Sequence, residues 1–179
     1  MDFDTNADIV ASDSRTTFYV ECKRPSSVKI SKTIDETYDQ LKARYLAHRL
    51  GYEPRGLAVI SLNKLLNPET LQLRVQNTLE AKSTIEFEVN RFLNQNETLW
   101  YNGLDDRTMA VIAYATWAVF VEGQRGLYIL RQFGGKYVSN THDRILAHQD
   151  PDRVYFSVVL LELNKGVQKA FEGGLVHNG

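Results

Sequence analysis

The first 24 residues contain an acidic residue, a turn and a Glu-x-Lys sequence, and these carry the clearest chemical signal in the chain. The stretch from Asp8 to Arg24 is DIVASDSRTTFYVECKR. Carboxylates such as Asp8 and Glu21 supply the oxygen ligands that Mg²⁺ prefers, often one or two of them with waters and a substrate phosphate. A lysine such as Lys23 beside them would place a positive charge near a scissile phosphate or an attacking water. These residue types predict metal-assisted hydrolysis at phosphorus.

Two strands joined by a turn must position these side chains. Residues 7–12 and 17–23 are typical of short β-strands, and residues 13–16 (DSRT) have turn composition. Residues 25–27 (PSS) end the second strand. The pattern predicts a β-hairpin that can bring side chains of its two strands together on one face of the sheet.

The length of the turn decides whether the two carboxylates meet. With a four-residue loop, Ser12 faces Thr17, and Asp8 then lies directly opposite Glu21, with Cβ atoms roughly 4.5–5.5 Å apart. A two-residue loop leaves the pair diagonal, roughly 7–8 Å apart or somewhat less. A three-residue loop would put the two carboxylates on opposite faces and remove the site.

Strand alternation places the rest of the Glu-x-Lys sequence. Lys23 points to the same face as Glu21 because side chains along a strand alternate with period 2. Cys22 is expected to point the other way, into the core. Its backbone carbonyl lies between the two site residues and is a further candidate metal ligand.

An Asp-bearing strand, a tight turn and a strand ending in Glu-x-Lys together resemble the core of the PD-(D/E)XK, or restriction-endonuclease-like, nucleases. The match rests on Asp8 and on Glu21 and Lys23 in the segment FYVECKRP, and it covers roughly residues 1–62. In that family the acid and the Glu-x-Lys pair hold Mg²⁺, and the lysine assists hydrolysis of a phosphodiester. The resemblance implies a Mg²⁺- or Mn²⁺-dependent nuclease acting on DNA, with RNA as an open alternative substrate.

The chain departs from the family pattern at its start. The common core begins with a helix and a strand before the Asp-bearing strand, whereas Asp8 comes only eight residues in. The expected fold is α/β, a mixed central sheet flanked by helices, with a restriction-endonuclease-like core that lacks its usual first helix and strand. Either the chain is a fragment, or those elements come from elsewhere in the fold or from a partner, such as a second copy or a larger complex.

Two other functions stay open. One is a non-catalytic module on the same scaffold that binds nucleic acid or a protein without cutting. The other is an unrelated α/β interaction protein in which the Glu-x-Lys pattern arises by chance.

Basic residues are concentrated just after the candidate site. Between residues 22 and 64 there are nine Lys or Arg residues against four acids, in a chain of net charge −1. Arg24, Lys29 and Lys32 follow the Glu-x-Lys sequence directly and are candidates for contacts with a nucleic-acid backbone. A solvated helix face explains the same pattern equally well. Gln40 is an accessory candidate, because some relatives orient the active site with a Gln on this helix, although a surface Gln is the simpler reading.

The remaining helices and strands are predicted from the spacing of apolar residues and from capping and turn residues. A helix is expected at about 33–50, opened by Thr33 and Glu36 at capping-box spacing and ended by Gly51. Further segments are a buried strand at 56–62, a helix at about 67–93 with Asn67 as N-cap, and strands at 109–121, 126–133 and 154–163. The run 109–121 also fits a buried helix. We divide the chain into a nuclease-like core, 1–97, and a β-rich C-terminal extension of the same domain, 98–179.

The amino-acid composition limits the cellular compartment in which the chain is expected. One cysteine excludes an internal disulfide, which fits a reducing, cytoplasmic compartment. The longest apolar run, about 13 residues, is too short to cross a bilayer, so no membrane association is expected. The four histidines are scattered without metal-ligand spacing and are read as structural or surface residues.

Overall fold

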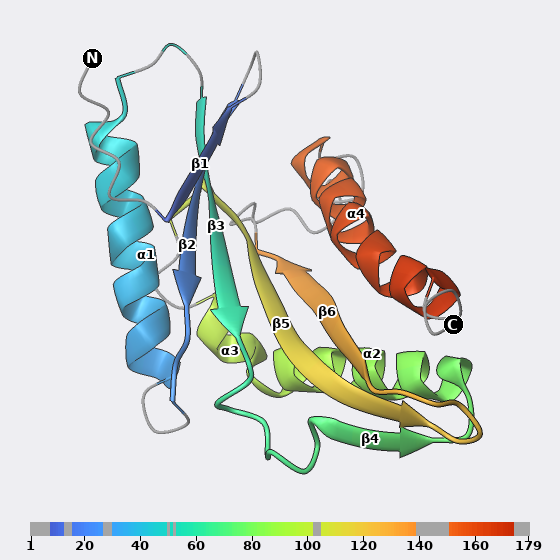
Figure 1. Cartoon of the computed structure of the whole chain (residues 1–179). Coiled ribbons are helices and arrows are strands. Elements are labelled where there is room, and N and C mark those ends of the chain that lie inside the picture. Colours follow the sequence, from blue (N-terminus) through green and yellow to red (C-terminus); the bar gives the residue numbers. More distant parts are fainter. Residues whose placement is uncertain are drawn as a thin grey trace.

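The computed structural model describes residues 8–12, 16–26, 30–49, 51, 53–101, 105–138 and 151–173, with side chains from 153 to 165 in the last segment. Strands and helices are mixed along the chain (Figure 1). The strands are β1 (Ile9–Ser12), β2 (Thr16–Lys23), β3 (Glu53–Ser61), β4 (Gln72–Val75), β5 (Thr108–Val121) and β6 (Tyr128–Tyr137). The helices are α1 (Ile30–Ala47), α2 (Thr78–Gln95), α3 (Glu97–Trp100) and α4 (Pro151–Gly173).

The strands form one open, mixed sheet of six strands in the order β1-β2-β3-β5-β4, with β6 paired to β5 as well. Strands β2, β3, β5 and β4 are parallel to one another, while β1 is antiparallel to β2 and β6 is antiparallel to β5. Strand β3 pairs with residues 108–114 of β5, and β4 pairs with residues 118–121. The two shorter strands therefore follow one another along β5.

A single side chain bridges the break between β3 and β4. The Oδ1 atom of Asn63 accepts a hydrogen bond from the backbone N–H of Thr116 at 3.3 Å, where β5 has no strand partner on that side. Just before the break, the N–H of Leu62 donates to the carbonyl of Tyr114 at 2.7 Å. The ladder along β5 is thus continued by an amide side chain.

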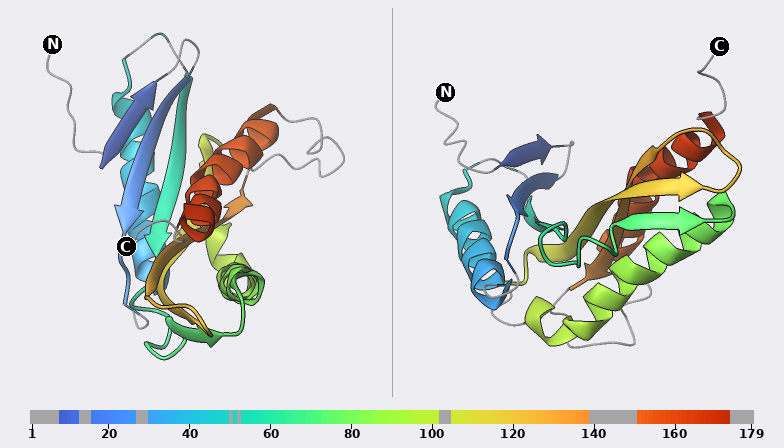
Figure 2. Two further views of the ribbon diagram at one scale, coloured as in Figure 1. Left: turned by 45° about the vertical axis from the view of Figure 1, so that its right-hand side comes forward. Right: turned by 60° about the horizontal axis from the view of Figure 1, so that its bottom comes forward.

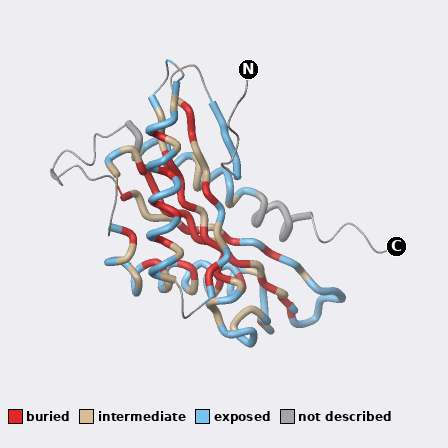
Figure 3. Tube along the Cα trace, turned by 90° about the vertical axis from the view of Figure 1, so that its left-hand side faces the viewer, coloured by how far each residue is buried: buried red, intermediate tan, exposed pale blue. Residues whose placement is uncertain are grey.

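Helices cover both faces of the sheet (Figure 2). The larger core cluster joins α1, α2 and α3 to one face, through residues such as Leu41, Ile85 and Trp117. The smaller cluster joins α4 to the other face, through Phe156 and the strand residues Leu57 and Ile112. Figure 3 shows the buried residues running along the strands between the helices. The fold is α/β, with a mixed sheet between two helical layers.

The hairpin and the central strands confirm several sequence expectations. The register Ser12↔Thr17 in the β1–β2 pair is the one expected for a four-residue loop. Strand β5 settles the ambiguous run 109–121 as a strand. Strands β5 and β6 are joined by a turn in which Gly123 adopts a φ of 75° that only glycine takes up readily.

The expected helix at 67–93 is wrong in its first third. Asn67 caps a turn instead, with its Oδ1 accepting from the N–H of Glu69, and residues 72–75 form β4. Helix α2 begins at Thr78, where Asn77 is the N-cap and accepts from the N–H of Glu80 at 2.9 Å. Leu73 and Val75 point to the same face of the sheet, so their period is 2 and not 3.6.

Two other helix predictions also need correction. Residues 154–163, expected as a strand, lie inside helix α4, and Phe156 and Leu160 pack on the sheet at the helical spacing i, i+4. Helix α1 begins at Ile30, so Thr33 lies within it and is not its N-cap. The helix ends at Ala47, before Gly51. Among the described residues, no helix combines the length and apolar composition needed to cross a membrane.

Candidate active site at the β1–β2 hairpin

Asp8 lies beside the Glu-x-Lys segment. Because Ile9 pairs with Val20, the preceding residue Asp8 is level with Glu21. Its Oδ2 atom accepts a hydrogen bond from the backbone N–H of Cys22 at 2.6 Å. The carboxylate of Asp8 is therefore held against the middle residue of Glu21-Cys22-Lys23, at the edge of β2.

Glu21 lies beneath α1 and is almost completely buried, with only 2% of its surface exposed. Two cations approach its carboxylate. Lys23 Nζ lies 3.2 Å from Oε2, and Arg44 Nε, from the last turn of α1, lies 3.7 Å from Oε1. We call Glu21, Lys23 and Arg44 the Glu21 cluster. A buried carboxylate needs such neighbours, since burial strongly disfavours an unpaired charge.

One oxygen of Glu21 lacks a hydrogen bond. In the described part of the chain, Oε1 of Glu21 and Nε of Arg44 are buried atoms without hydrogen-bond partners. Their separation of 3.7 Å is an ionic contact and is too long for a hydrogen bond. Oε1 therefore keeps its capacity to accept a donor or to bind a cation.

The donor set can be compared with the needs of a divalent cation. No group of three or more His, Cys, Asp or Glu side chains suited to a metal occurs among the described residues. Asp8 and Glu21 offer two carboxylates, and each makes its hydrogen bond through one oxygen. Two carboxylates fit Mg²⁺, which keeps several waters and often completes its shell with a substrate phosphate. A site with a full set of protein ligands does not fit these residues.

The Cys22 side chain is exposed, and the expectation that it points into the core is wrong. Cys22 does face away from Glu21, on the face of β2 where Phe18 stacks on Tyr155 of α4 with ring centroids 5.3 Å apart, but Cys22 itself lies beyond this contact and is exposed. Partial burial raises the pKa of the Cys22 thiol, and the neighbouring carboxylates of Asp8 and Glu21 raise it further. The thiol is therefore less readily ionised than an ordinary cysteine.

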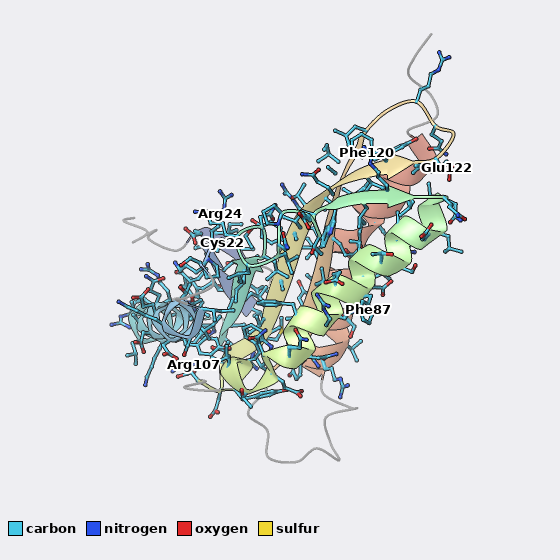
Figure 4. All side chains as sticks on the ribbon, turned by 90° about the horizontal axis from the view of Figure 1, so that it is seen from below. Cys22, Arg24, Phe87, Arg107, Phe120 and Glu122 are labelled. Atoms are coloured by element: carbon cyan, nitrogen blue, oxygen red, sulfur yellow. The ribbon has the colours of Figure 1, made fainter. Side chains whose placement is uncertain are left out.

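The residues predicted to contact nucleic acid, and the accessory candidate Gln40, differ in their distance along the chain from the hairpin and in their partners. Arg24 is exposed and lies at the same end of β2 as Cys22 (Figure 4). Lys32 is exposed on α1 and forms an ion pair with Glu36 at 3.6 Å. Gln40 is exposed on α1, away from the buried side of that helix. Lys29 lies outside the described residues.

Arg44 is the component of the cluster that the sequence analysis missed. The buried side of α1 carries Ile34, Tyr38, Leu41 and Tyr45. Arg44 flanks that stripe, because it follows Leu41 by three residues and precedes Tyr45 by one. An arginine at the border of an apolar stripe was the available signal for a buried acidic partner.

A second polar pair extends the interface between α1 and β2. The hydroxyl of Tyr19 lies 2.9 Å from Nδ1 of His48, just beyond the end of α1. Burial raises the pKa of Tyr19, and the charge of Arg44 acts in the opposite direction. His48 therefore has a structural partner, in line with the reading of the histidines from sequence.

Comparison of the chain with protein-family models, with curated proteins and with solved structures found no match.

Proposed function

We propose that this chain is a Mg²⁺-dependent nuclease that hydrolyses phosphodiester bonds in DNA. One observation carries the proposal: Asp8, Glu21 and Lys23 are brought to one segment of β2 by the register of the β1–β2 hairpin. Two carboxylates with an adjacent ammonium are a donor set suited to a hard cation and a phosphate.

The roles of the side chains follow from their positions. Asp8 and Glu21 would hold the metal ion, with the backbone carbonyl of Cys22 as a further ligand. A bound Mg²⁺ supplies Lewis acidity at a phosphoryl oxygen and lowers the pKa of a coordinated water. Lys23 would orient that water and offset negative charge that develops on the phosphate. Arg44 positions the Glu21 carboxylate from α1.

The test is cleavage of supercoiled plasmid and of end-labelled linear DNA with Mg²⁺ or Mn²⁺. The variants are Asp8→Asn, Glu21→Gln and Lys23→Met, each checked for folding by circular dichroism. We expect each to lose at least about 100-fold in rate, the size typical for removing an electrostatic contact to the transition state. Matched controls are Glu97→Gln and Lys136→Met, because this acid–lysine pair, 3.7 Å apart, lies on other elements.

The cleavage assay gives different results for a nuclease and for a chain without this activity. Metal-dependent cutting that the three site variants abolish and the two controls retain supports the proposal. Cutting that survives all three site substitutions, or a complete lack of cutting by a folded chain with both metals, contradicts it.

A second function is favoured by the burial of Glu21. Glu21 is 2% exposed, and its carboxylate already has Lys23 and Arg44 as counter-ions, an arrangement that stabilises a fold without any metal. This favours a non-catalytic module that binds nucleic acid or a protein. Titration with Mn²⁺, followed by electron paramagnetic resonance, distinguishes the two. The nuclease binds Mn²⁺ in a manner that Asp8→Asn and Glu21→Gln weaken, whereas the non-catalytic module leaves the Mn²⁺ signal unchanged.

A further inference from the structure

One face of the β4–β5–β6 region is open, on the side of the sheet that α4 covers elsewhere. Along β5 the residues on that face change steadily from the start of the strand to its end. Ala110 and Ile112 are buried, Tyr114 is half-buried, and Phe120 is 41% exposed. In Figure 4, Phe120 lies on the side of the sheet opposite α2. The far half of this sheet face therefore has no covering layer in the described structure.

Helix α4 stops covering β6 at a definite place. The Phe156 ring packs so closely on Gly135 that a Cβ there would lie 2.4 Å from it. The side-chain amide of Asn164 then pairs with the backbone of Phe133, donating to its carbonyl at 2.8 Å and accepting from its N–H at 3.0 Å. Beyond this point Arg131 is exposed and Ile129 is 62% exposed.

The open face carries two arginine–aromatic pairs. The guanidinium of Arg74 on β4 lies over the ring of Phe120 on β5, 5.4 Å from its centroid. The guanidinium of Arg131 on β6 lies over Tyr114 on β5, also at 5.4 Å. The pairing Arg74↔Phe120 in the β4–β5 register puts both side chains on one face. We call these four residues the arginine–aromatic face.

The arginine–aromatic face carries positive charge, and its own strands supply no acidic side chain. The strands β4, β5 and β6 contain no Asp or Glu. No carboxylate forms an ion pair with Arg74 or Arg131 in the part of the chain that the structure describes. Glu122, directly after β5, lines a pocket of about 330 Å³ together with Arg74 and Phe120. The face is therefore apolar and cationic in a chain of net charge −1.

Stacked planes and guanidinium groups without a carboxylate partner suit one class of ligand, and the hydrogen bond of 3.5 Å from Nε of Arg131 to Oγ1 of Thr116 leaves the terminal nitrogens of Arg131 to bind it. A guanidinium that lies on a ring keeps its N–H donors directed outward in its own plane, where they can bind a phosphate through two hydrogen bonds. Nucleobases stack on aromatic rings and on guanidinium planes alike. In a duplex those base faces are covered by neighbouring base pairs, so only a single strand presents them.

We propose that the arginine–aromatic face binds single-stranded nucleic acid. Tyr114 and Phe120 are six residues apart on β5, which corresponds to about 20 Å along a strand. A stacked single strand rises about 3.4 Å per nucleotide, so a segment of about six nucleotides reaches both pairs. Bases stack on the two ring–guanidinium planes, and Arg74 and Arg131 bind the adjacent phosphates.

This binding site is separate from the proposed catalytic one. Glu21 and Lys23 lie on the α1 face of the sheet, because Glu21 is level with Ala58 in the core cluster shared with α1. The arginine–aromatic face lies on the opposite side. Binding there requires neither a metal ion nor cleavage, so it is measured independently of nuclease activity.

The test is fluorescence anisotropy of labelled dT12, rU12 and a 12-base-pair duplex with the full chain in EDTA, over a range of salt concentrations. The variants are Phe120→Leu, which keeps an apolar side chain without the ring, and the double substitution Arg74→Met/Arg131→Met. The control is Arg91→Met on the exposed side of α2.

We expect dT12 and rU12 to bind and the duplex to bind at least ten-fold more weakly. Phe120→Leu should weaken single-strand binding about ten-fold, in line with the loss of one stacked base. The arginine double variant should lower the slope of log K against log salt by about 1.4, since each phosphate contact to a single strand contributes about 0.7. Arg91→Met should bind as the unmodified chain does.

Three results would overturn the proposal. One is the absence of single-strand binding by the folded chain at low salt. A second is single-strand binding that neither Phe120→Leu nor the arginine double variant weakens. The third is a monomer–dimer equilibrium, seen by sedimentation, that Phe120→Leu shifts while no oligonucleotide binds, which assigns the face to a protein contact.

Discussion

The arginines of the Glu21 cluster and of the arginine–aromatic face differ in what neutralises them. Arg44 lies against a buried carboxylate, and its side chain is only 18% exposed. Arg74 and Arg131 lie on aromatic rings at an exposed sheet face, with no carboxylate paired to them among the described residues. The same side chain therefore has a mainly structural part in one region and is available to a ligand in the other.

Arg107 is an intermediate case that connects the two. Its guanidinium lies over the ring of Tyr45 at 4.8 Å and also forms two hydrogen bonds with the carboxylate of Asp105, at 2.8 and 2.9 Å. It combines the ring contact of Arg74 with the acidic partner of Arg44. If the comparison is right, the free-energy cost of removing each arginine should follow the burial of its acidic partner.

The largest effect is expected at Arg44. Arg44→Met leaves Glu21 buried with Lys23 as its one remaining counter-ion, and should lower the free energy of unfolding by about 2–3 kcal/mol. Urea unfolding followed by circular dichroism measures this. Glu21→Gln/Arg44→Met should recover much of the loss, because the buried charge is then removed. A loss below about 0.5 kcal/mol for the single variant would mean that Arg44 does not neutralise Glu21.

Next in size is the boundary at which α4 stops covering the sheet. Asn164→Ala removes both side-chain hydrogen bonds to the backbone of Phe133, and should cost about 1–2 kcal/mol. Ser157→Ala, which removes a bond on the exposed side of the same helix, should cost less than about 0.5 kcal/mol. Amide exchange at Phe133 should accelerate in Asn164→Ala alone. Equal losses in the two variants would show that Asn164 does not fix this boundary.

A smaller, pH-dependent effect is expected at Asp105. Hydrogen bonds from Arg107 lower the pKa of its carboxyl from the usual 3.8. A lowered pKa contributes stability that is present above the unfolded-state value and is lost as the pH falls through the folded-state value. The stability difference between the native chain and Asp105→Asn should therefore be about 0.5–1 kcal/mol at pH 6 and should shrink below about pH 4. A difference that stays constant from pH 6 to pH 3 would contradict the lowered pKa.

The smallest effect on stability is expected at Arg74. Arg74→Met removes a cation–ring contact at an exposed site, which contributes about 0.5 kcal/mol or less here. Thermal unfolding should place its midpoint within a degree or two of that of the native chain. A large loss would show that Arg74 is a structural residue like Arg44, and the contrast between the two regions would fail.

The sequence predicted the hairpin in detail because local signals decide it. Turn composition and strand alternation left loops of two, three or four residues open, and the observed register Ser12↔Thr17 selects the four-residue loop, which puts Asp8 level with Glu21. The run 109–121 and its turn at Gly123 are equally local, although the helical alternative for that run was excluded only by its pairing with β3 and β6. Turn residues and the spacing of apolar side chains thus predict local structure correctly where both indicate the same element.

The errors arose where tertiary packing decides. Leu71, Val75 and Leu79 have helical spacing, yet Val75 is buried in a strand and Leu79 is 75% exposed on α2. Residues 154–163 are apolar on several sides, so their period does not distinguish a strand from a helix that is exposed on one side. The burial of Glu21 depends on Arg44, which lies 23 positions further along the chain, and no local pattern pairs those two residues.

Strand β5 has a consequence for the order in which the chain can fold during synthesis. It pairs with β3, β4 and β6 and, among the strands that the structure describes, it alone joins β1, β2 and β3 to β4 and β6. Because it begins at Thr108, more than half of the polypeptide leaves the ribosome before the central strand is available. Until then β3 has an unpaired edge, exposed as a template for association with other chains. The edge of β3 therefore stays open until β5 has been synthesised and has left the ribosome, and a ribosome pause placed directly after residue 121 would prolong that exposure.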